Sequence, residues 1–442
     1  RARRFRPGGW GVSVPMGARK LNLRHPASIL LVLLLAACGA DEERLPGERI
    51  PVRAESGGVV QRAGDLPVTL GAAIENAEWT HAGRTAARNP GHVALPVGLT
   101  RVFRADIGRG GLSGGGVVVA DGRVFAFDGG DSVAAFSPAG ARLWTTGLRP
   151  ASERSDGFGG GIAHAGGLVF VTTGYGEVVA LDPGDGAIRW RAGFDAPFRS
   201  APVSDGQRVI AVSRADEAVA LDAGTGRTIW RVQAAAGGEG LPSTADPVLF
   251  EGVALLPSSN GEVTAVLAGN GRRLWTSSLG SGRRDLARSA IVDVSAAPII
   301  SGTSVYFGNE AGTTQAADTR SGQAIWTAPE GAADTMAIAG QDLFQISDRR
   351  SLLRLSAVTG EVIWAQPLDG FVRRAPASWR GPILAGGRLL VLSSEGDVLS
   401  IAPEDGSLVQ SGSLGIAPQG ALAIAGGRLY VVASGGRLYG FE

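Results

Sequence analysis

The feature that most constrains this chain is a tryptophan that returns at nearly regular intervals at the end of a recurring segment. Six tryptophans follow the pattern at spacings of 38 to 51 residues: Trp144, Trp190, Trp230, Trp275, Trp326 and Trp364. This interval is typical of a four-stranded β-propeller blade. One such sheet cannot bury both of its faces, whereas sheets stacked around an axis bury one another. The repeats therefore predict an all-β fold built from four-stranded antiparallel blades.

One repeat shows how residues divide among the strands. Residues 200–203 begin the inner strand, residues 208–213 form the second, residues 218–222 the third and residues 227–231 the fourth. The aspartates that precede the last turn in three repeats, Asp182, Asp222 and Asp318, are expected to cap that turn with their carboxylates.

The last repeats predict the number of blades. A seventh unit covers residues 379–410, with Gln410 at the tryptophan position, and an eighth begins near Pro418 but lacks a fourth strand. Residues 100–105 form an unassigned alternating segment, in which Phe103 lies 41 residues before Trp144. We expect this N-terminal strand to complete the last blade. Residues 77–442 then form an eight-bladed β-propeller.

The strand order also predicts where binding residues gather. Each fourth strand and the next first strand meet at one rim, and the longest connections, roughly 145–159, 231–243, 277–294 and 366–377, lie mostly there. Long loops on a rigid scaffold commonly carry binding sites.

The first 37 residues resemble a bacterial signal peptide. Basic residues Arg19, Lys20 and Arg24 precede an apolar run at 29–37, which is too short to span a bilayer and suits a signal sequence. Because Met16 is the first methionine, it is left open whether residues 1–15 precede the true start.

The apolar run ends in a sequence that resembles a lipobox, Leu-Ala-Ala-Cys-Gly at 35–39. Cys38 is the only cysteine of the chain, and lipidation (palmitate) explains a lone exported thiol. Gly39 after the cysteine favours a lipid-anchored location at the outer membrane, facing the periplasm. Residues 38–76 are polar and irregular, and a flexible tether of that length reaches about 35 Å.

The residue content excludes several functions. The 42 basic and 41 acidic residues leave no basic surface for nucleic acid. The four histidines show no metal-ligand spacing, and the glycine clusters at 108–116 and 157–161 lack the Lys-Ser/Thr ending of a phosphate loop. We therefore expect a binding protein rather than an enzyme, with no cofactor and no metal.

Residues 157–190, from Gly-Phe-Gly-Gly-Gly-Ile-Ala-His to Ile-Arg-Trp, resemble the signature blade of the BamB family. The stretches at 79–83 (Trp-Thr-His-Ala-Gly) and 89–92 (Asn-Pro-Gly-His) resemble the segment that precedes its first blade. The likeness covers roughly residues 76–442. It implies a lipoprotein subunit of the outer-membrane β-barrel assembly machinery, with a BamA-like pore subunit as partner and unfolded outer-membrane proteins as candidate clients.

The resemblance also implies a partner-binding site. The family's apolar residue and arginine before the third inner strand fall on Phe198 and Arg199. Its acidic pair before the fifth inner strand falls on Asp293 and Ser295, so one carboxylate is absent. Arg283 and Arg284, in the connection 277–294, complete the set of predicted partner-binding residues.

Two alternatives remain open. A propeller lipoprotein of this kind can serve a different envelope partner. Quinone-dependent dehydrogenases use similar repeats, but their pattern often includes adjacent cysteines, which a chain with Cys38 alone cannot supply.

Overall fold

The computed structural model describes residues 67–111, 113–233, 245–280 and 292–442. The chain divides into two units, Arg1–Gly57 and Gly58–Glu442, and all described residues belong to the second. Strands dominate the described residues, whose one helical element is a 3-10 turn, η2 (Asp369–Phe371). In the described ranges, no helix has the length and apolar character needed to cross a membrane.

Most strands form four-stranded antiparallel sheets in chain order. These sheets are β6 (Ile162–Ala165), β7 (Leu168–Thr172), β8 (Glu177–Leu181) and β9 (Ile188–Gly193); β10 (Val203–Ser204), β11 (Arg208–Val212), β12 (Glu217–Asp222) and β13 (Thr228–Gln233); β14 (Val248–Phe250), β15 (Val253–Pro257), β16 (Glu262–Leu267) and β17 (Arg273–Ser278); β18 (Val294–Ser301), β19 (Ser304–Asn309), β20 (Thr313–Asp318) and β21 (Ala324–Ala328); β22 (Ala337–Ala339), β23 (Asp342–Ile346), β24 (Ser351–Ser356) and β25 (Val362–Pro367); β26 (Trp379–Ala385), β27 (Arg388–Ser393), β28 (Asp397–Ile401) and β29 (Leu408–Ser413).

The remaining strands form one eight-stranded sheet in the order β1-β32-β31-β30-β2-β3-β4-β5. Its first half is β1 (Arg101–Asp106), β32 (Arg437–Phe441), β31 (Arg428–Ala433) and β30 (Pro418–Ala425), and its second is β2 (Gly116–Ala120), β3 (Arg123–Phe127), β4 (Ser132–Phe136) and β5 (Arg142–Gly147). A single parallel pair, Gly116 with Ala421, joins the halves. The segment predicted at 100–105 is therefore a strand, β1, and it pairs antiparallel with β32.

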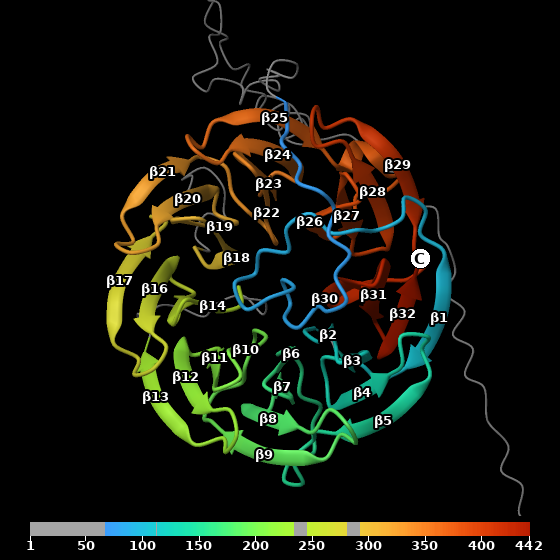
Figure 1. Ribbon diagram of the computed structural model, residues 1–442, viewed down its shortest axis with the longest axis vertical. Helices are drawn as coiled ribbons and strands as arrows, with labels where there is room; N and C mark the ends of the chain where they lie inside the picture. The colour runs from blue at the N-terminus through green and yellow to red at the C-terminus, as the bar shows by residue number, and fades with distance from the viewer. Residues whose placement is uncertain (1–66, 112, 234–244, 281–291) are drawn as a thin grey trace, which may run out of the picture. The chain divides into compact units, whose positions relative to one another are not determined.

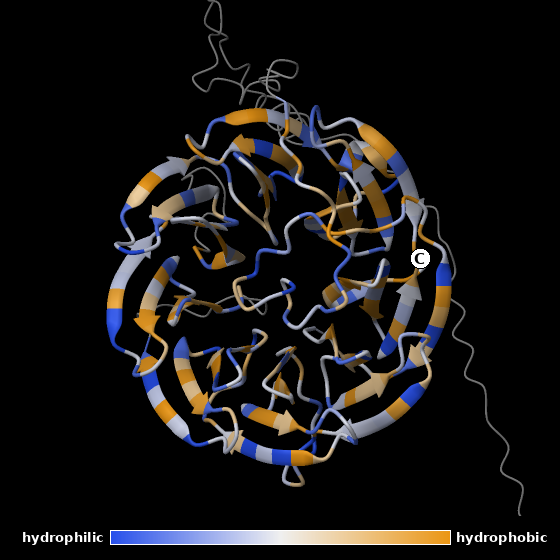
Figure 2. Cartoon of the chain, in the orientation of Figure 1, coloured by the Kyte–Doolittle hydropathy of each residue, from blue (hydrophilic) through white to orange (hydrophobic). Residues whose placement is uncertain are grey.

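The sheets of this unit stand side by side around a common axis, as in a β-propeller (Figure 1). In each sheet the middle strands are buried, whereas the outermost strands are more exposed: β5 and β13 alternate between exposed and covered residues, and β29 is exposed throughout. Figure 2 shows the corresponding polar positions along the outer strands. Neighbouring sheets thus cover both faces of the middle strands, which is the reason for the predicted stacking.

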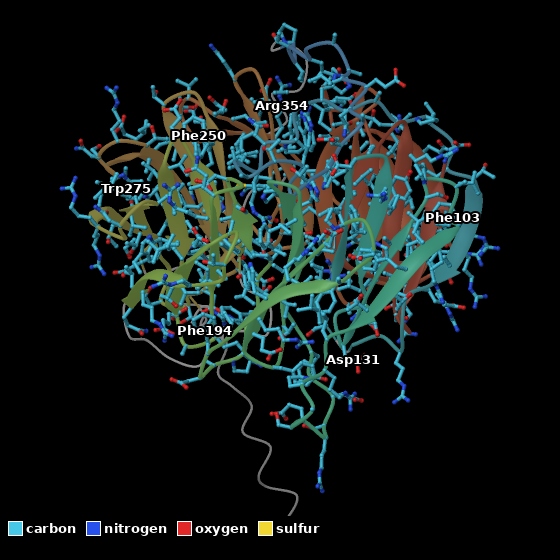
Figure 3. The ribbon with its side chains drawn as sticks, turned by 60° about the horizontal axis from the view of Figure 1, so that its bottom comes forward. Phe103, Asp131, Phe194, Phe250, Trp275 and Arg354 are labelled. Carbon is cyan, nitrogen blue, oxygen red and sulfur yellow. The ribbon has the colours of Figure 1, made fainter. Side chains whose placement is uncertain are left out.

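The two rims differ in the connections that they carry. The loop rim is the one at which the innermost strands (β2, β6, β10, β14, β18, β22, β26 and β30) begin, and the turn rim is the one at which they end. The long connections predicted from the sequence run from an outermost strand to the next innermost strand and so lie at the loop rim. In Figure 3, Asp131 and Phe194 lie at the lower, loop-rim end, and Phe250 lies toward the upper end.

Each repeated tryptophan packs against the next sheet at a glycine. A Cβ built on Gly226 would lie 2.6 Å from the Trp190 ring, and its φ of 71° is unfavourable for other residues. The same contact recurs in the pairs Gly186–Trp144, Gly271–Trp230, Gly322–Trp275, Gly360–Trp326 and Gly406–Trp364. Each indole N–H also donates to a backbone carbonyl in that turn, at 2.8–3.0 Å.

Phe103 makes the same contact at the junction of β1 with the first sheet. A Cβ on Gly140 would lie 2.5 Å from the Phe103 ring, so Phe103 takes the place of a tryptophan, as its spacing predicted. Phenylalanine has no N–H to donate. Arg428 instead donates to the carbonyl of Pro138, in the turn where the indole bond would form, at 2.9 Å.

The geometry also explains Gln410, which stands at the tryptophan position of β29. In the following part of the fold β32 pairs with β1, which is not joined to it by a turn. Thr100 and Glu442 exchange backbone hydrogen bonds at that point instead. No turn glycine therefore stands opposite Gln410 as one stands opposite each repeated tryptophan.

The predicted aspartate caps are confirmed. Asp182, Asp222 and Asp318 each accept backbone N–H groups from their own turn, at 2.7, 2.9 and 2.9 Å for the shortest bonds. Hydrogen bonding lowers the pKa of all three carboxyl groups; for Asp182 the main cause is the guanidinium of Arg189. The inner strand predicted at 200–203 is shorter than expected, since the N–H of Ala201 donates to Asp246 and β10 begins at Val203.

A segment before β1, which we call the strap (residues 74–93), runs around the axis at the turn rim. It is the blue trace across the centre of Figure 1. It bonds to the last residues of successive innermost strands: Asn76 to Ile424, Trp79 to Val119, Thr80 to His164, His81 to Ser204, Ala86 to Leu249, Asn89 to Ile300 and Val93 to Leu384. The strap therefore closes the axial channel at the turn rim.

His81 is the polar centre of the strap. Its Nε2 accepts the N–H of Ser204 at 3.2 Å. Burial, together with the charge of Arg88, lowers the pKa of His81 from 6.5 to about 3. The folded protein thus keeps a neutral imidazole, which can act as an acceptor.

The seam contact predicts that Gly226→Ala is more destabilising than Gly252→Ala. Both glycines have positive φ, 71° and 78°, and an alanine there costs about 1 kcal/mol. Only at Gly226 does the new methyl group meet a tryptophan ring; Gly252 has nothing within 4 Å. Overpacking adds about 1–3 kcal/mol. Equal losses in urea unfolding would contradict this account of the seams.

The strap predicts an acid-dependent loss of stability. Since the folded pKa of His81 lies below its unfolded value, the stabilisation is present above pH 6.5 and is lost as the pH falls toward about 3. The slope approaches about 1.4 kcal/mol per pH unit for one proton. His81→Gln should flatten the dependence of the unfolding free energy between pH 6.5 and 4. An unchanged slope would show that His81 is not the titrating group.

Candidate functional site

Phe198 lies in the connection between β9 and β10, at the loop rim. Its side chain is 1% exposed and meets Phe194 edge to face, with ring centroids 5.5 Å apart. Its N–H donates to the carbonyl of Thr173 in the preceding sheet, and it bridges to Ser213 in its own sheet. Phe198 therefore fastens two neighbouring sheets together rather than facing solvent.

Arg199 is the centre of a buried ionic cluster. Its guanidinium lies 3.5 Å from a carboxylate oxygen of Asp216 and 3.8 Å from one of Asp293. The Arg199 side chain is 1% exposed. Burial lowers the pKa of Arg199, whereas Asp293 and Asp216 raise it. Two carboxylates thus offset much of the cost of burying one cation.

The cluster joins three successive sheets. Asp216 lies in the turn between β11 and β12, and it also accepts the N–H of Ser259, at 3.2 Å, and the Ser259 hydroxyl. Ser259 belongs to the β15–β16 turn, and Asp293 directly precedes β18. A chain of polar contacts therefore holds the loop rim together beside the axis.

The structure brings together three of the predicted partner-binding residues, Phe198, Arg199 and Asp293, but it buries all of them. Their burial and their contacts across neighbouring sheets indicate that they hold the surrounding connections of the loop rim in position. Ser295, where a second acid was expected, donates its hydroxyl to the carbonyl of Ala332.

Arg283 and Arg284 lie outside the described residues, as does Cys38. Across the described ranges, no group of three or more His, Cys, Asp or Glu side chains is arranged to hold a metal ion.

An exposed acidic groove lies directly beside Phe198, and it was not predicted from the sequence. Its volume is about 260 Å³, and its carboxylates come from two connections, Glu153 and Asp156 in one and Asp195 in the other. Tyr175 lines it too, and its hydroxyl is buried without a hydrogen-bond partner among the described residues. The available signal was the acidic residues Glu153, Asp156 and Asp195 in two successive connections that lead into innermost strands.

Charged side chains and aromatic rings lie close together at the loop rim. Arg149 pairs with Asp131 at 2.9 Å and with Asp156. Phe158, close to the groove in sequence, is 39% exposed. The Arg231 guanidinium stacks over Phe194 at 4.9 Å from the ring centroid. Aromatic residues and arginine are enriched at protein–protein interfaces.

A family model described as outer membrane protein assembly factor BamB matches residues 129–366 and 369–442. Curated relatives of that name include those of Legionella pneumophila, 26% identical over 45% of this chain and 50% of the relative, and Escherichia coli, 27% identical over 46% and 49%. The chain thus spans about half the length of these curated relatives.

Solved structures show the same fold. The crystal structure of BamB from Moraxella catarrhalis matches with a TM-score of 0.62 at 18% identity, covering 78% of this chain and 98% of that one. A quinohemoprotein alcohol dehydrogenase from Comamonas testosteroni matches with a TM-score of 0.65 at 14% identity, covering 84% and 81%. At such identities the likeness shows a common β-propeller fold alone.

The buried cluster predicts that Arg199→Met is strongly destabilising. The change leaves the Asp216 and Asp293 carboxylates buried without their cation, a loss of about 3 kcal/mol. Arg214→Met, a change at an exposed arginine of the β11–β12 turn that also holds Asp216, is the matched control and should leave the unfolding free energy nearly unchanged. Equal stability of the two variants in denaturant unfolding would contradict the role assigned to Arg199.

Proposed function

The chain belongs to the BamB family of outer-membrane protein assembly factors, and from this premise we propose that it is a non-catalytic scaffold of the β-barrel assembly machinery. It binds the periplasmic region of a BamA-like pore subunit and assists the folding and insertion of outer-membrane proteins. The observation that carries the proposal is the loop rim, where the buried Arg199 cluster holds three sheets in place beside an exposed groove.

The proposal assigns the partner contact to the surface that this cluster supports. Phe198, Arg199 and Asp293 position the connections, and Asp195, two residues beyond β9, presents its carboxylate in the groove. An acidic groove favours a partner surface that carries Lys or Arg side chains. Arg283 and Arg284 are proposed to extend the contact along the same rim.

The proposal includes the anchor and the domain organisation. Residues 1–37 are the signal peptide, Cys38 carries the lipid, and residues 38–76 link it to the propeller at 77–442. The anchor holds the protein at the periplasmic face of the outer membrane.

The propeller is proposed to have eight blades. In support, each half of the eight-stranded sheet has the strand order of a four-stranded sheet, and a single parallel pair joins them. The pairing of β1 with β32 and the packing of Phe103 on Gly140 support closure of the ring by the N-terminal strand.

Detergent extraction and co-purification test the partner assignment. Asp195→Lys should reduce recovery of the pore subunit about tenfold or more, because it places a cation where a basic partner surface is expected. The matched control is Glu361→Lys, an exposed acid in a turn of the opposite rim, which should leave recovery unchanged. Both variants should keep the wild-type melting temperature.

Two results would contradict the proposal. Equal recovery with Asp195→Lys and Glu361→Lys would remove the groove from the interface, and recovery of a different envelope protein in place of the pore subunit would replace the partner.

In the same preparation, Cys38→Ala should move the protein to the soluble periplasmic fraction; retention with outer membranes would overturn the anchor.

A further inference from the structure

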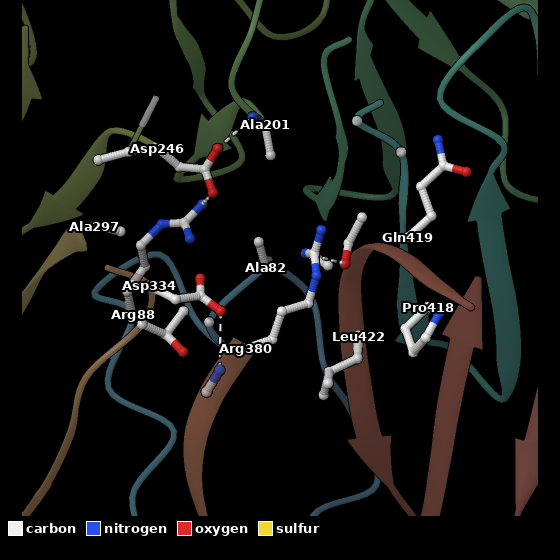
Figure 4. Close-up of a pocket in the computed structure, with 18 of the residues that line it drawn as sticks. Ala82, Arg88, Ala201, Asp246, Ala297, Asp334, Arg380, Pro418, Gln419 and Leu422 are labelled. Atoms are coloured by element: carbon white, nitrogen blue, oxygen red, sulfur yellow. Dashed lines mark hydrogen bonds and ion pairs between the residues drawn. The ribbon is translucent and has the colours of Figure 1, made fainter. Parts of the chain in front are cut away.

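A cavity of about 410 Å³ occupies the axis of the propeller, a size in the usual range of small-molecule sites. Its walls are the first residues of innermost strands and the connections before them, and strap residues such as Ala82 and Arg88 lie at its turn-rim end. Figure 4 shows the Arg88 and Arg380 side chains directed into this space, with Ala82 between them. The strap closes one end, so a ligand would enter from the loop rim.

The carboxylate of Asp246, which lines this cavity, already has an ion-pair partner and a hydrogen-bond donor within the protein. Its carboxylate pairs with Arg88 at 2.6 Å and accepts the N–H of Ala201. Arg199, which also lines the cavity, pairs with Asp216 and Asp293 on its other side. These two arginines are therefore engaged by carboxylates of the protein.

Arg380 differs from them. One of its terminal nitrogens donates to the carbonyl of Gly420 at 3.0 Å, while its Nε is buried with no hydrogen-bond partner among the described residues. No carboxylate of the described chain makes an ion pair with it; Asp334 acts on it only at longer range. Burial raises the pKa of Asp334, whereas the charge of Arg380 and the N–H of Gly381 lower it.

A second donor without a partner lies in the cavity lining. Trp79 is 1% exposed, and its indole N–H has no acceptor among the described residues. Buried donors of this kind cost free energy unless an acceptor reaches them. Apolar side chains, Ile299, Met336 and Leu422, line other parts of the same space.

We propose that the axial cavity is a binding site for a small organic carboxylate, whose anionic end pairs with Arg380 and whose apolar body packs against Ile299, Met336 and Leu422. A planar guanidinium matches a carboxylate, and the pairing strengthens where water is excluded. This assignment does not depend on the proposed partner at the outer surface of the rim.

Benzoate and its neutral counterpart benzamide test the site on the purified full-length protein. By isothermal titration and saturation-transfer NMR, benzoate should bind at least tenfold more tightly than benzamide, because only benzoate offers a carboxylate to Arg380. Arg380→Gln should weaken benzoate binding at least tenfold and leave benzamide binding unchanged. Arg373→Gln, at an exposed arginine outside the cavity lining, is the matched control and should bind as the wild type does.

Ala82→Leu provides a second variant that keeps every charge and fills the cavity from the strap, so it should weaken both probes. Binding of benzoate no tighter than benzamide, or no binding of either probe, would overturn the proposal. So would full benzoate binding by Ala82→Leu or by folded Arg380→Gln. Displacement of benzoate by equimolar phosphate would also overturn it, since phosphate has no apolar body.

Discussion

The contact between an aromatic ring on one sheet and a glycine turn on the next underlies the whole structure. It places a large apolar group where two twisted sheets meet, and the missing Cβ allows the ring to lie directly on the backbone. The indole N–H then satisfies a carbonyl of the same turn, so the contact fixes both distance and register. Repeated from sheet to sheet, it sets the angle at which successive sheets surround the axis.

The strap adds a constraint at the axis that the seams do not provide. Its backbone and a few side chains bond to the ends of successive innermost strands, which fixes those strands at the turn rim. This arrangement needs a neutral His81, because a protonated ring could not accept the N–H of Ser204. Strap residues also line the axial cavity at its turn-rim end.

At the loop rim, rigidity and recognition are divided between different residues. Arg199 and its two carboxylates are buried and connect the sheets, whereas the groove beside them carries exposed carboxylates. A rigid support of this kind keeps connections in place without using the carboxylates of Glu153 and Asp195. Disruption of Arg199 would therefore act on the proposed binding surface through its packing.

Local patterns in the sequence were sufficient for the all-β fold, for the strand at β1, for Phe103 as a substitute for tryptophan and for the aspartate caps. These features depend on spacing along the chain and on bonds within one turn, so the sequence by itself determined them. It did not reveal that Phe198, Arg199 and Asp293 are buried, that residues 74–93 form a strap, or that Arg380 faces an axial cavity. Only the tertiary structure decided these, because burial and charge pairing depend on sheets that meet in space but lie far apart in sequence.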